Sequence, residues 1–151
     1  MGQIMRRDDW PERLHDYLAL EHRFDWLTNN CALFAAGAVL AMTGEDVAKE
    51  FRGIKTRLSM ERKLRRIGGL TALCTACFGE SIPILTARRG DIVIARVFVS
   101  PPTNVMIGPD DEDGSLMDAV GVCLGAQVAL LTETGITYYP LATVKAAWRV
   151  S

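Results

Sequence analysis

Residues 29–44 read NNCALFAAGAVLAMTG, and this stretch predicts a buried helix with a cysteine in its first turn. Asn29 or Asn30 can cap the open backbone N–H groups, and Gly44 follows Thr43 where a helix commonly ends. The small residues between these caps allow a sheet to approach the helix closely. We therefore expect this helix to lie at the centre of the fold.

Cys31 stands at the N-terminal end of this expected helix. The positive end of the helix dipole favours the thiolate, which is how nucleophilic cysteines are commonly activated. Buried structural cysteines occupy the same kind of position, because free cysteine is among the most buried residue types. Position alone leaves both interpretations open, and the structural one is the more common.

The composition is that of an ordinary globular protein. The chain has 151 residues, of which 49% are hydrophobic and 23% charged, and its formal net charge is -1. This length predicts one domain spanning residues 1–151. The small net charge gives no reason to expect nucleic acid or an anionic membrane surface as a partner.

Targeting signals and cysteine usage indicate where the chain is made. The longest nearly apolar run, residues 31–42, is too short to span a bilayer, and residues 1–9 contain no secretory signal pattern. The four cysteines are therefore expected as thiols of a protein made in the cytoplasm, because disulfide frameworks belong to secreted chains.

The spacing of apolar residues changes from helical to strand-like near Arg88. The first expected helix starts after its cap, Asp9, and the second starts at Cys31. Three others are expected at residues 45–51, 55–67 and 70–78. The expected strands cover residues 92–99, 119–125, 127–131 and 136–140, and an edge strand at 148–150 follows a helical turn at 141–147. This order predicts the α+β class, with N-terminal helices packed on a curled antiparallel sheet.

Cys74 and Cys77 form a C-x-x-C motif, which can bind zinc or an iron–sulfur cluster or exchange disulfides. Both also fall on the apolar stripe of the helix expected at 70–78, with their thiols facing the core. A zinc site would need two more ligands, and only Cys31, Cys123, His15 and His22 remain. We favour core cysteines without a cofactor, and keep the metal site as an alternative.

Two charged segments of opposite sign are candidate contact surfaces. The basic one lies on the helix expected at 55–67 and contains Arg57, Arg62, Lys63, Arg65 and Arg66. The acidic one lies in a loop expected at 100–115 and contains Asp110, Asp111, Glu112 and Asp113. Each is either a solvated surface or a contact with a partner of opposite charge.

Several motifs, taken in order, resemble those of a known superfamily. They are FDWLTNNC at residues 24–31, AMTG at 41–44, RGD at 89–91, VGVCLG at 120–125 and AWRV at 147–150. A helix that begins with cysteine, followed by a Gly-Asp turn into a strand, is similar to NlpC-type cell-wall cysteine peptidases, which have a papain-like fold. The whole chain most closely resembles a small tail-associated family of phage and prophage proteins within that superfamily.

The resemblance implies a peptidase site that is incomplete in this chain. Cys31 matches the nucleophile, but the position of the general-base histidine, directly before Val120, is Ala119, and Asn30 stands where aspartate is usual. Alanine cannot accept a proton, and base assistance contributes about 10² to 10⁴ in rate. The resemblance therefore implies an inactive domain in a phage tail tip or baseplate, held by other tail proteins and in reach of peptidoglycan.

Two alternatives remain at this point. The first is an active peptidoglycan hydrolase, in which His15, His22 or a partner subunit supplies the base. The second is an iron–sulfur or zinc protein that uses Cys74 and Cys77, with Cys31 and Cys123 as further ligands.

Overall fold

The computed structural model describes residues 4–98 and 116–151. Its α-helices are α1 (Trp10–Ala19), α2 (Cys31–Thr43), α3 (Arg57–Ile67) and α4 (Leu70–Phe78). Short 3-10 helices lie at Lys49–Phe51, Ile84–Thr86 and Leu141–Thr143. The strands are β1 (Ile92–Phe98), β2 (Leu116–Cys123), β3 (Gln127–Thr132), β4 (Gly135–Pro140) and β5 (Val144–Trp148).

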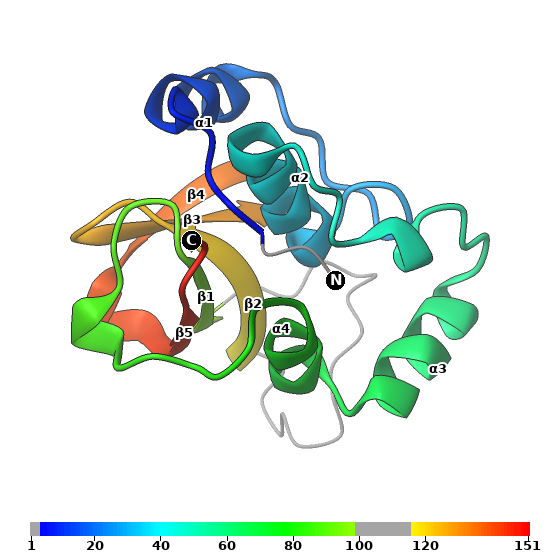
Figure 1. The fold of residues 1–151 in the computed structure, drawn as a ribbon. Coiled ribbons are helices and arrows are strands. Elements are labelled where there is room, and N and C mark those ends of the chain that lie inside the picture. Colours follow the sequence, from blue (N-terminus) through cyan, green and yellow to red (C-terminus); the bar gives the residue numbers. More distant parts are fainter. Residues whose placement is uncertain (1–3, 99–115) are drawn as a thin grey trace.

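The predicted α+β class is confirmed, since four helices precede a five-stranded antiparallel sheet in the described residues. The strand order is β4-β3-β2-β1-β5, and Figure 1 shows α1 and α2 on one side of this sheet with α3 at the periphery. No helix in residues 4–98 and 116–151 combines the length and the apolar character needed to cross a membrane.

Local capping explains where α2 begins and ends. The Asn30 side chain accepts a hydrogen bond from the Leu33 backbone N–H at 2.9 Å, and Gly44 adopts a left-handed φ of 82° after the last turn. Asp9 is the N-cap residue of α1, as predicted, but its carboxylate accepts from Arg13 Nε at 2.7 Å and caps no backbone N–H group.

The end of the chain differs from the sequence prediction. The helical turn expected at 141–147 is only the 3-10 helix Leu141–Thr143, and the last strand starts at Val144, not at Trp148. β5 pairs with β1 in the register Ile92↔Trp148 and Val93↔Ala147. Cross-strand pairing therefore overrides the weak helical pattern of these residues, as packing against a neighbour commonly does.

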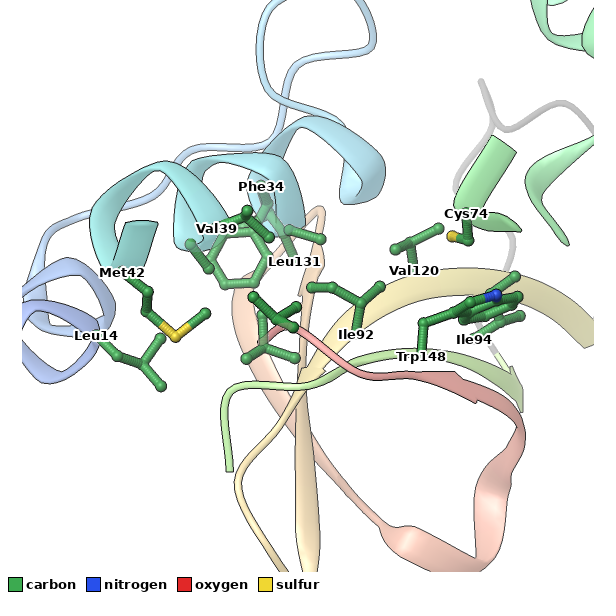
Figure 2. Close-up of a cluster of buried hydrophobic side chains, with 14 residues drawn as sticks. Leu14, Phe34, Val39, Met42, Cys74, Ile92, Ile94, Val120, Leu131 and Trp148 are labelled. Atoms are coloured by element: carbon green, nitrogen blue, oxygen red, sulfur yellow. The ribbon is translucent and has the colours of Figure 1, made fainter. Parts of the chain in front are cut away.

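Two apolar layers lie on opposite faces of the sheet. In the layer beneath α2, Phe34, Val39 and Met42 belong to one buried cluster with Ile92 and Val120. Figure 2 shows Phe34 and Val39 pointing toward the strands and Met42 beside Leu14. The layer on the other face is formed by Val93, Ala95, Val97, Cys123, Val128, Leu130, Val144 and Ala147. The sheet is thus buried on both faces, which explains its near-continuous apolar strands.

Asp91 joins the start of β1 to both ends of the chain. Its side chain is fully buried, and Oδ1 accepts from Arg6 Nη2 at 2.8 Å and from the Val150 backbone N–H at 3.1 Å. Oδ2 accepts from the Arg88 backbone N–H at 2.9 Å and lies 3.4 Å from Arg149 Nε. A buried carboxylate is stable only with such partners, so this group holds three distant segments together.

Candidate functional site

Cys31 is the first residue of α2, and the residues before it hold it in place. Asn30 Nδ2 donates to the Trp26 carbonyl at 3.0 Å, in addition to the cap that its oxygen provides. Asp25 and Asn29 form a small antiparallel bridge, so the segment that leads into α2 is a closed turn. The thiol is therefore held at the helix N-terminus by a fixed backbone.

β2 lies against this end of α2. β1 pairs with β2 along residues 116–122, whereas β3 pairs with it only at Val122 and Cys123 among the described residues. The Val120 backbone N–H lies close enough to the Cys31 sulfur to lower the pKa of that thiol. The side chain of Val120 belongs to the layer beneath α2, and the side chain of Ala119 packs on the layer of the opposite face.

The electrostatic balance at Cys31 favours the neutral thiol. Burial raises the pKa of the Cys31 thiol, and this effect outweighs the backbone N–H groups of Val120, Ala32 and Cys31 itself, which lower it. No histidine or carboxylate in residues 4–98 and 116–151 donates to or accepts from the sulfur. Since ordinary thiols are already mostly protonated at pH 7, Cys31 is even less ionised there.

The structure places both histidines in other roles. His15 is exposed on α1. His22 Nε2 donates to the Tyr17 carbonyl at 2.6 Å, and the imidazole lies edge-on to the rings of Tyr17 and Phe34, with centroid distances of 4.6 and 5.1 Å. His22 thus stabilises the packing of α1 on α2, and neither histidine hydrogen-bonds to Cys31.

A cavity of about 260 Å³ opens beside Cys31. Its walls include Trp26, Asn30, Cys31, Leu64, Cys74, Cys77, Ala119, Val120 and Leu131. At one side, the Arg57 guanidinium lies 4.2 Å from the centroid of the Trp26 ring, a cation–π contact. The cavity is mostly apolar around the thiol, and Glu61, Asp118 and Glu133 also line it. None of these carboxylates hydrogen-bonds to the Cys31 sulfur.

Residues 5–150 match a family described as a domain of unknown function, DUF6950. The chain belongs to this family. No curated protein and no solved structure matches the chain. The match includes Cys31, Asp91 and Trp148, so the cavity and the buried carboxylate both lie within the DUF6950 domain.

The C-x-x-C pair of the DUF6950 domain lies on α4. Cys74 is buried and Cys77 half-buried, and burial together with the neighbouring thiols of Cys77 and Cys31 raises the pKa of Cys74 to about 12. Cys123 lies in the layer on the other face of the sheet, with its sulfur beside Gly125. In the described part of the chain, no group of three or more histidine, cysteine or acidic side chains is placed to hold a metal ion.

The structure separates the charged candidates into groups. The Arg57 guanidinium lies over the Trp26 ring, and Arg57 Nε is 3.7 Å from Glu61 Oε1. Lys63 Nζ donates to the Glu50 carbonyl. Arg62, Arg65 and Arg66 are exposed on α3. The acidic residues Asp110, Asp111, Glu112 and Asp113 lie outside the described residues.

The structural roles of Asp91 and Trp26 were not apparent from the sequence. The sequence showed Asp91 only as part of a turn, and its burial depends on partners distant in sequence, Arg6 and Val150. Trp26 was visible as one position of the FDWLTNNC motif, but its contact with Arg57 joins segments far apart in sequence.

We expect the alkylation of Cys31 by iodoacetamide to be slow at pH 7 and still rising above pH 9. The raised pKa leaves less thiolate at neutral pH than the few per cent of an ordinary cysteine. Pulsed labelling and mass spectrometry of the peptide that contains Cys31 give the pH profile, with the urea-unfolded chain as the reference. A profile with its midpoint below pH 7 would instead reveal an activated nucleophile.

Proposed function

We propose that this DUF6950 domain is a structural component of a phage tail tip or baseplate, built on an NlpC-like peptidase fold that has lost catalysis. The observation that carries the loss of catalysis is the state of Cys31. Burial raises the pKa of its thiol, which only backbone N–H groups counteract, and no imidazole is hydrogen-bonded to it in the described residues. A cysteine peptidase needs a base that takes the thiol proton and returns it to the leaving amine.

The arrangement around Cys31 supports the scaffold part of the proposal. A cysteine at a helix N-terminus beside the second strand of an antiparallel sheet is the order that the resemblance implies. Ala119 and Val120 of that strand both border the cavity, but only the Val120 side chain lies on the face toward α2, and the Ala119 side chain packs on the other face. The virion location and the tail partners follow from the resemblance alone.

The phage itself provides the test. In phage that carry Cys31→Ser, we expect the chain in purified tails at its normal stoichiometry and infectivity unchanged within a factor of about two, because the thiol performs no chemistry. Quantitative mass spectrometry of virions and plaque titres measure both. Deletion of the chain is the matched control and should remove infectivity. Normal particles with lost infectivity in Cys31→Ser would contradict the proposal.

An active peptidoglycan hydrolase is the second candidate. It is favoured by the position of Cys31 at the N-terminus of α2, on the wall of a cavity. It requires a base supplied by a partner chain or by a rearranged His15 or His22. Release of peptide fragments from purified peptidoglycan by the assembled tail, lost in Cys31→Ser, would establish it, and absence of release would remove it.

A further inference from the structure

We propose that the exposed face of α3 binds an acidic segment of a neighbouring protein. We call this surface the basic face; it consists of Leu58, Arg62, Arg65 and Arg66. The inference deepens the proposed function, because it states the chemistry of one partner. This inference depends on the proposed function only where it places the acidic partner in a virion.

The helical spacing of α3 separates its residues into two faces. Leu58, Arg62, Arg65 and Arg66 follow the i, i+4, i+7, i+8 pattern, so they share one side of the helix, and all four are exposed. Met60, Leu64 and Ile67 lie on the opposite side and are partly buried against the body of the domain. Figure 1 shows α3 at the periphery of the domain. Because Met60 and Ile67 pack on the core from the opposite side of the helix, the basic face is directed to solvent.

The other two cations of α3 are already used inside the domain. Arg57 contacts Trp26 and Glu61, and Lys63 donates to the Glu50 carbonyl and lies 5.2 Å from the Phe51 ring centroid. Within residues 4–98 and 116–151, the side chains of Arg62, Arg65 and Arg66 form no hydrogen bond, ion pair or ring contact. Of the five basic residues of α3, the structure thus leaves three guanidinium groups available.

The spacing of these three groups works against the helix that carries them. Arg62 and Arg66 are four residues apart and Arg62 and Arg65 three apart, and like charges at these spacings repel. Arg65 and Arg66 lie in the last turn, where the helix dipole favours cations, but Arg62 lies one turn earlier and gains nothing from it. An external anion removes this repulsion.

The chemistry of the basic face fits carboxylates of a protein. A guanidinium binds a carboxylate through two parallel hydrogen bonds, and three of them within about one turn match acidic residues spaced one turn apart on a helix. Leu58, which is 55% exposed, adds an apolar contact that a polypeptide can meet and a phosphate backbone cannot. A chain with a net charge of -1 also lacks the wide positive field that nucleic-acid binding needs.

Fluorescence anisotropy with labelled decaglutamate and the full chain tests the proposal. We expect saturable binding at 50 mM NaCl, at least tenfold weaker at 300 mM NaCl and at least tenfold weaker in the variant Arg62→Gln/Arg65→Gln/Arg66→Gln. Glutamine keeps helix propensity, so α3 should stay folded. The matched control, Arg13→Gln/Arg23→Gln/Arg89→Gln, removes three charges elsewhere and should change the affinity less than twofold.

Thermal melting of the α3 variant supplies a second readout. If the three arginines serve binding and not the fold, the variant should melt at the same temperature as the unmodified chain or above it. Equal losses of binding in the two triple variants would overturn the proposal, because they would show a response to net charge only. Tighter binding to a labelled dodecathymidine strand than to decaglutamate would overturn it in favour of nucleic acid.

The outcomes for the two proposals are separable. Incorporation of the chain into virions without any decaglutamate binding would overturn this inference and leave the proposed function. Specific decaglutamate binding by a chain that is absent from virions would overturn the proposed location and leave the acidic partner.

Discussion

Replacing Asp91 with asparagine should lower the free energy of unfolding by about 3–5 kcal/mol. The carboxylate receives only donors, from Arg6, from the Val150 backbone N–H and from the Arg88 backbone N–H. An asparagine amide would direct its own N–H groups at one set of these donors and would leave Arg6 without its buried counter-charge. A loss of this size is a large fraction of the stability of a typical domain.

Urea unfolding followed by tryptophan fluorescence measures this effect. Asp118→Asn is the matched control, since Asp118 pairs with Arg96 and Lys145 but is partly exposed. Such a surface pair contributes about 1 kcal/mol or less. Similar losses of unfolding free energy in Asp91→Asn and Asp118→Asn would show that burial does not determine how much Asp91 contributes to stability.

Gly121→Ala should lower the free energy of unfolding by about 3 kcal/mol, the upper end of the usual range for overpacking. A Cβ at this position would lie 2.5 Å from the Ala129 carbonyl oxygen and closer still to the Leu130 side chain. β3 pairs with β2 only at Val122 and Cys123 in the described chain, so a shift of β3 would disturb the few contacts that hold it. The carbonyl belongs to the backbone and cannot rotate away.

Two further variants separate lack of space from backbone strain. Gly53 has a φ of +83°, and a Cβ at this position would meet no atom within 4 Å. Gly53→Ala should therefore cost only about 1–2 kcal/mol, through the left-handed conformation of the backbone. Leu130→Ala should not rescue Gly121→Ala, because the Ala129 carbonyl remains. Full rescue would contradict the backbone clash.

Two of the motifs that carried the resemblance prove to be one structural unit. Asp91 of the RGD turn accepts from the backbone N–H of Val150 and lies beside Arg149, both in the AWRV segment. Arg6 completes the group by donating to the Val150 carbonyl at 2.7 Å and to the Arg89 carbonyl at 2.8 Å. These motifs therefore stabilise the closure of the chain and are separate from the cavity at Cys31.

The candidate site was predictable only in part. Its cysteine, the asparagine cap and the adjoining strand are local features, visible as a capping residue before an apolar helix and as a short apolar run. Strand alternation places the Ala119 side chain on the sheet face away from α2, and the group of β2 that lowers the pKa of the Cys31 thiol is the Val120 backbone N–H. Neither fact could be inferred from the residues before the register of β2 was known.

Local sequence patterns were enough to predict the α+β class, the limits of α2 and the positions of β1, β3 and β4 to within about a residue. These features depend on capping and alternation, which act over a few neighbouring residues. Only the folded chain showed that β5 starts at Val144 and that Asp91 links both chain ends. It also showed that Arg57 turns inward, whereas Arg62 is exposed. Those outcomes depend on contacts between residues distant in sequence, and the separate segments contain no local signal for such contacts.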